Sequence, residues 1–262
     1  MAGLLLVVIA LLGLAIGSFL TVVIDRVPRG ESVVRPRSRC PNCGQRIRDR
    51  HNIPVLGWLI LRGRCADCGH PIGIRYPLVE LATAGLFAAV TIRLIDTPAA
   101  LPAYLYFTAI GVALAMIDLD TRRLPNAIVL PSYPVLAVLL TGSALWQGQW
   151  WPLARAGIGA AALFGFYLLL VMAYPKGMGW GDVKLAGLLG AVLGYLSWAA
   201  LVVGAFAGFV LGAVLGVAVL LARQGDRKTA LPFGPFMIAG ALLAIFVADP
   251  LADAYLRLVG SS

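Results

Sequence analysis

The stretch GLLLVVIALLGLAIGSFLTVVI, residues 3–24, runs for 22 residues without a charged side chain. A helix of that length crosses about 30 Å, which is the thickness of the hydrocarbon core of a membrane. Its apolar residues form a continuous run rather than an alternating one, so a strand of a transmembrane barrel is excluded. Because no Lys or Arg precedes Arg26, the run also lacks the basic start of a cleaved signal peptide. We therefore expect a retained membrane-spanning helix whose N-terminus faces outward.

Runs of this kind recur along the whole chain. The protein has 262 residues, of which 60% are hydrophobic and 13% charged, whereas a soluble domain of this size needs more polar surface. We predict an all-α polytopic membrane protein with about eight transmembrane helices. The predicted spans are residues 3–24, 78–95, 101–117, 128–146, 154–174, 183–197, 199–222 and 233–249.

Basic residues are distributed unevenly between the segments that separate these spans. Eighteen of the 21 Lys and Arg residues fall in four segments: 25–77, the stretch after the third span, the 175–184 turn, and the stretch after the seventh span. By the positive-inside rule these segments are cytoplasmic and both termini face outward. The net charge of +9 is explained by this bias and by attraction to anionic membrane lipid, so it gives no argument for nucleic-acid binding.

All four cysteines lie in the large cytoplasmic segment, in CPNCG at 40–44 and CADCG at 65–69. Each Cys-x2-Cys pair can direct two thiolates at one ion, and four thiolates suit tetrahedral Zn²⁺ in a closed, structural site, with iron as a lesser alternative. Two disulfides are the other alternative, but the cytoplasm is reducing. We predict that a Zn²⁺ ion folds this segment, which is too small for a core of its own, and that its ligands are Cys40, Cys43, Cys65 and Cys68.

The two histidines, His51 and His70, lie in the same segment, and we interpret them as solvated loop residues. The chain contains no His-Glu-x-x-His motif, so the chemistry of zinc proteases has no ligands. Because no histidine lies in or near the spans, Ser–His or Cys–His catalysis at the membrane has no base. Carboxylates therefore remain as the candidate catalytic groups.

Two aspartates are expected at one depth at the inner membrane edge. Asp118 ends the third span and Asp182 begins the sixth, so the topology brings them to the same level although 64 residues separate them. Two carboxyl groups that share a proton can hydrolyse a peptide as aspartyl proteases do, one activating water and the other protonating the carbonyl oxygen. Taken alone, Asp182 is explained equally well as a helix-terminal acid stabilised by the helix dipole.

Spacing leaves the choice between Asp118 and its neighbour Asp120 open. They are two residues apart, so they point about 200° away from each other on a helix and only one can face Asp182. Asp118 is deeper, whereas Asp120 has the position of a solvated loop residue. Glu80 also lies slightly inside the membrane edge, either as a partner of Arg75 or as part of a polar site.

Glycines at alternate positions precede the second aspartate in GMGWGD. Gly177, Gly179 and Gly181 lack side chains, which allows a sharp turn and the close approach of an extended peptide to Asp182. Helix packing explains the many glycines in 187–216, but it does not explain an acid directly after Gly-x-Gly.

Five stretches together resemble the type IV prepilin peptidases, which are the bifunctional leader peptidases and N-methyltransferases of pilus and type II secretion systems. The resemblance covers nearly the whole chain and implies that Asp118 of the Ile-Asp motif and Asp182 of the Gly-x-Gly-Asp motif are the catalytic pair. The stretches are GSFLTVVIDRVPRGES at 17–32, the cysteine pairs with NIPVLGWLILRGRC between them, IRYPLVELATA at 74–84, IDLDTRRLP with GMGWGDVKLAG, and KTALPFGPFM at 228–237.

This resemblance implies a multi-pass enzyme of the bacterial cytoplasmic (inner) membrane whose catalytic side is cytoplasmic. The family cleaves the basic leader of prepilins and pseudopilins after a glycine, and then methylates the new N-terminal residue with S-adenosylmethionine. Its cysteine segment is a zinc site associated with methyl transfer. In this chain Gly179, Gly181 and Lys184 are then expected to support the active-site turn.

The implied organisation has four parts. They are a first transmembrane helix at 1–24, a zinc-binding cytoplasmic segment associated with methyl transfer at 25–77, a transmembrane aspartyl protease bundle at 78–250, and an outward-facing tail at 251–262.

Two residues depart from the family pattern. Thr21 stands where asparagine is usual, and Asn126 stands where the family has the aspartate of Leu-Pro-Asp. Neither touches the aspartate pair, but Thr21 bears on methylation because its stretch is expected to contribute to the transferase site.

The residues leave two other functions open. One is a transporter or channel with a zinc-ribbon loop and a proton-relay aspartate pair, and the other is a peptidase without methyltransferase activity. The chain contains no glycine-rich fingerprint of a soluble methyltransferase, so the sequence gives no position for a pocket that binds S-adenosylmethionine.

Overall fold

The structure is a computed structural model that describes residues 2–175, 178–221 and 232–260. Within these ranges the chain is almost wholly helical and forms no β-strand, which confirms the predicted all-α class. Several predicted features lie outside the described residues: Lys176, Gly177, Arg223, Arg227 and Lys228.

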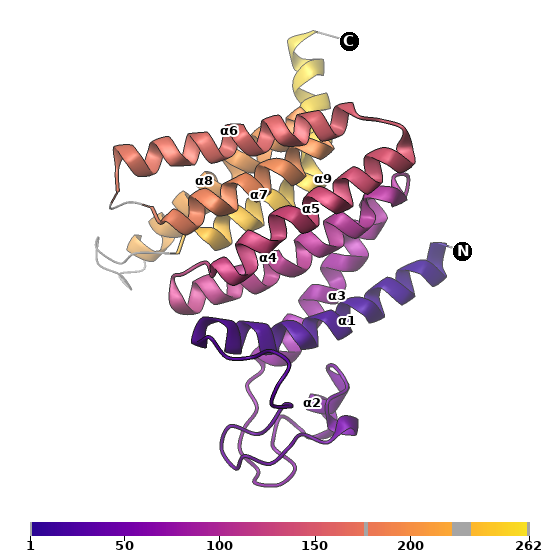
Figure 1. The fold of residues 1–262 in the computed structure, drawn as a ribbon, viewed down its shortest axis with the longest axis vertical. Helices are drawn as coiled ribbons and strands as arrows, with labels where there is room; N and C mark the ends of the chain where they lie inside the picture. The colour runs from indigo at the N-terminus through magenta and orange to yellow at the C-terminus, as the bar shows by residue number, and fades with distance from the viewer. Residues whose placement is uncertain (1, 176–177, 222–231, 261–262) are drawn as a thin grey trace. The chain divides into compact units, whose positions relative to one another are not determined.

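Eight long helices correspond to the eight predicted spans (Figure 1). Seven of them are long and apolar enough to cross a membrane, so the chain is a multi-pass membrane protein. The eighth helix, α7, is shorter than these seven and has 17 residues. The bounds are α1 (Ala2–Arg26), α3 (Arg75–Arg93), α4 (Leu101–Thr121), α5 (Asn126–Gln147), α6 (Trp151–Ala173), α7 (Trp180–Leu196), α8 (Trp198–Leu221) and α9 (Gly234–Val259).

One helix end differs from the predicted spans, and one predicted division is confirmed. The last helix continues through Pro250 to Val259, beyond the predicted end at 249. The division between the sixth and seventh spans falls at Ser197, whose extended backbone (φ −165°, ψ 164°) ends α7. The hydroxyl of Ser197 then accepts a hydrogen bond from the Ala200 N–H at 2.9 Å and so caps α8.

The residues group into two compact units, which are described separately. The first contains α1, the short helix α2 (Leu56–Ile60) and α3, and the second contains most of α4 and helices α5 to α9. Their bounds are Met1–Asp96 with Thr108–Ala113, and Thr97–Phe107 with Leu114–Ser262.

In the first unit, α1 and α3 pack backbone against backbone. A Cβ atom added to Gly13 would lie 2.7 Å from the Cα of Ala84, and one added to Gly17 would lie 2.7 Å from the Cα of Glu80. This Gly-x-x-x-Gly spacing is the close-packing pattern of membrane helices, where small residues let backbones approach. The packing fixes the backbone of Glu80 against α1.

In the second unit, α7 is held between its neighbours by similar contacts. A Cβ atom on Gly159 of α6 would lie 2.5 Å from the Gly190 carbonyl oxygen of α7. At the far end of α7, the Arg155 guanidinium donates hydrogen bonds to the Gly194, Tyr195 and Leu196 carbonyl groups. These bonds satisfy the last carbonyls of the helix, so α7 is a rigid support for the aspartate at its other end.

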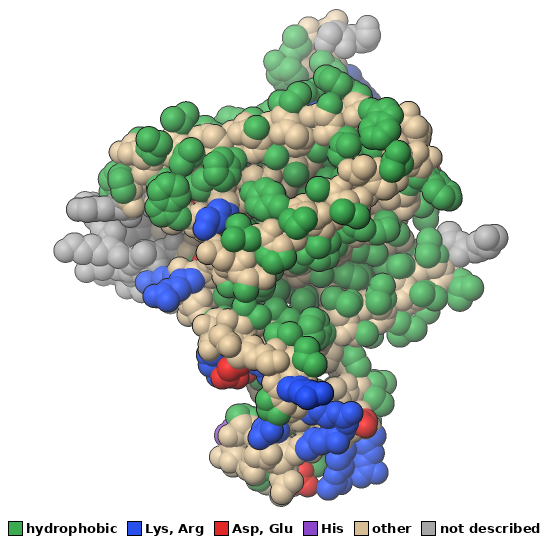
Figure 2. Space-filling view, in the orientation of Figure 1, with side chains coloured by type: hydrophobic (Ala, Val, Ile, Leu, Met, Phe, Trp, Pro, Cys, Tyr) green, Lys and Arg blue, Asp and Glu red, His purple; other side chains and the backbone are tan. Residues whose placement is uncertain are grey.

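The surface agrees with a membrane environment. Figure 2 shows hydrophobic side chains spread over the visible helices, while Lys and Arg gather over the segment between α1 and α3. Many large apolar side chains on the helices are exposed, among them Val138, Phe206 and Val214. Such a surface is stable in lipid, and a soluble monomer rarely carries one.

Candidate functional site

Asp118 lies in the last turn of α4, and its side chain is buried, with 5% of its surface exposed. Its Oδ2 accepts a hydrogen bond from the Gly234 N–H at 3.1 Å. Gly234 is the first residue of α9, so the helix directs one of its free N–H groups and the positive end of its dipole at this carboxylate. A Cβ atom at this position would lie 2.6 Å from Oδ2, so any other residue would displace the carboxyl group.

Asp182 occupies the first turn of α7 and is also buried, with 8% of its surface exposed. Its Oδ2 accepts a hydrogen bond from the Gly179 N–H at 3.0 Å, while its own N–H donates to the Gly179 carbonyl at 3.1 Å. The aspartate therefore closes the glycine turn and caps the helix, as the helix-terminal interpretation expected. Within the described residues, Oδ1 of neither aspartate accepts a hydrogen bond, which leaves one oxygen of each for other partners.

The two aspartates come together against the loop between α4 and α5. A Cβ atom on Gly181 would lie 3.0 Å from Leu124, and one on Gly234 would lie 3.4 Å from the same side chain. Gly181 directly precedes Asp182, and Gly234 is the hydrogen-bond partner of Asp118. Segments 64 residues apart thus place two buried acids beside one leucine.

The other predicted acids lie elsewhere. Asp120 is exposed at the end of α4, so Asp118 is the member of this pair that the fold buries next to Asp182. Glu80 belongs to the first unit, where its carboxylate accepts a hydrogen bond from the Val55 N–H at 2.6 Å and lines a cavity. Glu80 was expected either to pair with Arg75 or to form part of a polar site, and its position at the cavity fits the second interpretation.

Lys184 ties α7 to α5 and does not bond to either aspartate. Its Nζ donates a hydrogen bond to Oδ1 of Asn126 at 2.9 Å, and its backbone carbonyl accepts one from the Tyr133 hydroxyl at 2.6 Å. Asn126 therefore gives the Lys184 ammonium an uncharged acceptor, where an aspartate would form an ion pair. Gly179 and Gly181 form the turn itself, at the N-terminus of α7.

Sequence reasoning missed two neighbours of the pair. Gly234 had a signal, since Gly-Pro after a polar stretch is typical of a helix start. Tyr167 of α6 had none: it is 2% exposed, and its ring centroid lies 6.3 Å from that of Phe233, the residue before Gly234. Its ring stacks on Phe209 of α8, with centroids 5.7 Å apart.

The four cysteines form a second candidate site, in the first unit. Their sulfur atoms all lie within 4.8 Å of one another, and the Sγ atoms of Cys40 and Cys68 are 3.8 Å apart. A tetrahedral ion about 2.3 Å from each sulfur requires sulfurs about 3.8 Å apart. None of the four is in a disulfide, so the cluster could bind a metal ion.

Each cysteine pair is shaped by a knuckle with a left-handed glycine. Gly44 and Gly69 have φ values of 70° and 69°, and their N–H groups donate to the carbonyls of Cys40 and Cys65 at 2.9 and 3.0 Å. The positive φ explains why glycine follows each pair.

Backbone N–H groups of the knuckles also favour the thiolate form that binds metals. Hydrogen bonds from the backbone of Cys43 and Asn42 lower the pKa of the Cys40 thiol. A hydrogen bond from the His70 backbone is the main cause that lowers the pKa of the Cys68 thiol to about 7. These bonds favour the thiolate forms of Cys40 and Cys68, whereas the pKa of the Cys43 thiol is raised to about 12.

Comparison with known protein families assigns both parts of the chain. Residues 11–94 match the bacterial peptidase A24 N-terminal domain, and residues 105–217 match the type IV leader peptidase family. The first match contains the cysteine cluster, and the second contains Asp118 and Asp182.

Several curated relatives align with most of this chain, and each is named prepilin leader peptidase/N-methyltransferase. The relative from Aeromonas hydrophila is 38% identical over 94% of this chain and 92% of its own length. The relative from Bacillus subtilis is 34% identical over 96% of this chain and 98% of its own length. That from Myxococcus xanthus is 43% identical over 82% of this chain, which spans only 64% of that longer relative. No solved structure matches the chain.

Proposed function

Because this chain belongs to the type IV leader peptidase family, we propose that it removes the leader peptide of type IV prepilins and pseudopilins and methylates the new N-terminal residue. The observation that carries the proposal is that Asp118 and Asp182, the buried aspartates of the described residues, are each held by a backbone N–H beside the same side chain, Leu124. The relatives' names support the two activities, and the aspartate pair supplies the chemistry for the first.

Cleavage proceeds by general acid–base catalysis between the two carboxyl groups. One aspartate takes a proton from water, whose oxygen attacks the scissile carbonyl carbon, and the other gives its proton to the carbonyl oxygen, so that a tetrahedral intermediate forms. The carbon–nitrogen bond then breaks, the leaving nitrogen receives the proton that the first aspartate took from water, and the second aspartate takes a proton back as the new carboxyl group forms. The N–H groups of Gly234 and Gly179 hold the two carboxylates in place, which leaves their other oxygens for water and substrate. No histidine or cysteine takes part in these steps.

The substrate's own chemistry agrees with this position. A prepilin has a basic leader followed by an apolar helix, so its cleavage site, after a glycine, lies at the membrane surface. The aspartates lie at helix ends next to the basic loop that contains Arg122 and Arg123, which the positive-inside rule places in the cytoplasm. We therefore place the reaction at the cytoplasmic face of the bacterial inner membrane, with membrane lipid around the helices.

The cysteine cluster is proposed to hold a structural Zn²⁺, and S-adenosylmethionine to supply the methyl group. The fit of the sulfur spacing to a tetrahedral site supports zinc, and four sulfur ligands leave no open position for a reactant. The division into a methyl-transfer segment at 25–77 and a cleaving bundle at 78–250 is part of this proposal.

The test of cleavage uses the purified full chain in lipid with a prepilin substrate. Asp118→Asn and Asp182→Asn keep the shape of each side chain but remove its acid, so each should lower the cleavage rate at least about 10³-fold. The matched control is Asp120→Asn on the exposed end of α4, which should cleave at nearly the normal rate. Cleavage at the wild-type rate by either test variant would refute the mechanism.

Methylation is tested separately, by mass spectrometry of the N-terminus of the product. A methylated N-terminal residue that depends on added S-adenosylmethionine is expected. A cleaved but unmethylated product would mean that the protein is a peptidase without methyltransferase activity.

A further inference from the structure

The first unit contains an open cavity of about 800 Å³, lined by residues of α1, the cysteine segment and the start of α3. This volume lies within the range of roughly 300–1,000 Å³ that is typical of sites for small molecules and cofactors. Its lining includes Ser18 and Thr21 of α1, Trp58 of α2, and Glu80 of α3. The reaction at the aspartate pair in the second unit makes no use of it.

A buried carboxylate lies in the wall of this cavity. Glu80 is 7% exposed, and its Oε2 accepts the hydrogen bond from the Val55 N–H. Within the described part of the chain, Oε1 has no hydrogen-bond partner, although the residue lines the cavity. Glu80 thus contributes a largely buried carboxylate to the cavity lining, with one oxygen that can pair with a cationic group of a ligand.

The residue that bonds to Glu80 has an unusual backbone conformation. Val55 has φ 61° and ψ −52°, which is a genuine outlier for a β-branched residue. Its N–H is the group that bonds to Glu80, so the strained residue and the buried carboxylate are in direct contact. Strained residues of this kind concentrate at ligand sites.

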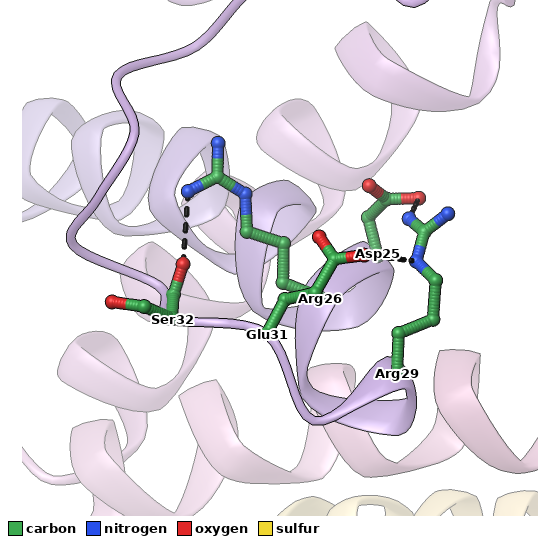
Figure 3. A network of polar contacts seen from close by, with 5 residues as sticks. All are labelled: Asp25, Arg26, Arg29, Glu31 and Ser32. Carbon is green, nitrogen blue, oxygen red and sulfur yellow. Dashed lines mark hydrogen bonds and ion pairs between the residues drawn. The ribbon is translucent and has the colours of Figure 1, made fainter.

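The rim is also fixed by specific contacts (Figure 3). Arg26 donates from Nη1 to the carbonyl oxygens of Ser32 at 2.9 Å and Pro36 at 2.8 Å. Arg29 pairs with Asp25 one turn earlier. These contacts tie the chain that leaves α1 to Arg26, and Arg26 and Pro36 both line the cavity.

Resting on the proposed function, we propose that this cavity is the methyl-transfer site: it binds S-adenosylmethionine, and Glu80 faces the amino group that is methylated. The lining offers the aromatic rings of Phe19, Trp58 and Tyr76 for a purine, and side chains of both charges for the amino-acid end. Cys40 and Cys65 belong to the same lining, so the metal cluster shapes one wall.

The charge balance of the reaction gives the carboxylate its role. The lone pair of the neutral N-terminal amine forms a bond to the methyl carbon, and the carbon–sulfur bond breaks with its electrons returning to sulfur. The positive charge thus moves from the sulfonium to the nitrogen, and S-adenosylhomocysteine leaves as a neutral thioether. A carboxylate fixed beside the nitrogen stabilises the charge that develops there.

Binding of S-adenosylhomocysteine to the zinc-loaded full chain, measured by isothermal titration calorimetry, tests the cavity. Ser18→Trp inserts an indole into the cavity and should weaken binding at least about 10-fold. The control is Leu12→Trp on the same helix, where the side chain is exposed and does not line the cavity. Leader cleavage by both variants, at rates near wild type, shows that each is folded.

Glu80→Gln tests the carboxylate, since glutamine can still accept the Val55 hydrogen bond. This variant should bind S-adenosylhomocysteine within about 2-fold of wild type and cleave the leader normally, while its kcat for methylation falls about 10²-fold. Methylation at the wild-type rate would overturn the role of Glu80.

The outcomes separate this inference from the proposed function. If wild-type protein methylates its product but Ser18→Trp binds S-adenosylhomocysteine as tightly as wild type, the cavity assignment is wrong and the proposed function stands. If wild-type protein binds the probe in this cavity but leaves the product unmethylated, the site is supported and the proposed methyl transfer is wrong. If wild-type protein neither binds S-adenosylhomocysteine nor methylates its product, the cavity assignment and the proposed methyl transfer are both wrong.

Discussion

Replacing Gly234 with alanine tests whether the start of α9 sets the position of the catalytic carboxylate. The new Cβ atom would lie 2.6 Å from Oδ2 of Asp118 and 3.3 Å from its Cγ. Carbon and oxygen atoms that are not bonded rarely approach within about 3.2 Å. The carboxyl group therefore has to move by roughly 0.6 Å or more, and the hydrogen bond from Gly234 is lengthened or lost.

A shift of this size has a predictable effect on the rate. A misplacement of about 1 Å in a catalytic group can lower the rate about 10²-fold. We expect Gly234→Ala to lower leader cleavage about 10- to 100-fold while the protein stays folded, because the clash is relieved by a side chain that can rotate. The effect should be smaller than that of Asp118→Asn, which removes the acid itself.

The assay is steady-state cleavage of a prepilin substrate by purified protein in lipid, with the thermal midpoint of unfolding measured alongside. Gly165→Ala in α6 is the matched control, since a Cβ atom there meets nothing within 4 Å. It should change the rate less than about 2-fold. Wild-type cleavage by Gly234→Ala, with an unchanged melting temperature, would refute the proposed contact between α9 and the aspartate.

Three other substitutions have defined outcomes. Gly159→Val should separate α6 from α7 and lower the free energy of unfolding by about 2 kcal/mol more than Gly157→Val, whose site is open; equal denaturation midpoints for the two would contradict the close packing. Asn126→Asp should restore an ion pair with Lys184, but at an exposed site its effect on stability should stay below about 1 kcal/mol; a larger change in the unfolding midpoint would show that this contact is underestimated. Cys40→Ser removes one of four sulfur ligands, so zinc content measured by mass spectrometry should fall well below one ion per chain, whereas leader cleavage persists; a full zinc content would rule out the four-sulfur site.

The helical fold could be predicted from the sequence because each span is a local property. The length of an uncharged run such as 3–24 is enough to indicate a membrane-spanning helix. The cysteine spacing likewise predicts a four-sulfur cluster without any tertiary information. Ser197 is also a local signal, since one extended serine ends α7 and caps α8. The extension of α9 through Pro250 was not predicted, because a proline normally ends a helix pattern.

The candidate sites were predictable only in part, because their contacts join remote segments. Topology alone brings Asp118 and Asp182 to one depth, yet the bond from Gly234 to Asp118 spans 116 residues and has no periodic signature. The same holds for Val55 and Glu80, whose hydrogen bond holds a conformation that local propensity disfavours. Local patterns identify the elements, and the packing of glycines between helices decides which side chains meet.

The central claim is that Asp118 and Asp182 act together on one peptide bond, and a structure with a bound, uncleavable prepilin peptide tests it most directly. We expect the nearest carboxylate oxygens of the two residues to lie about 3–5 Å apart, on either side of the scissile carbonyl. Carboxylates more than about 10 Å apart, or a peptide whose scissile bond lies away from both, would contradict the account.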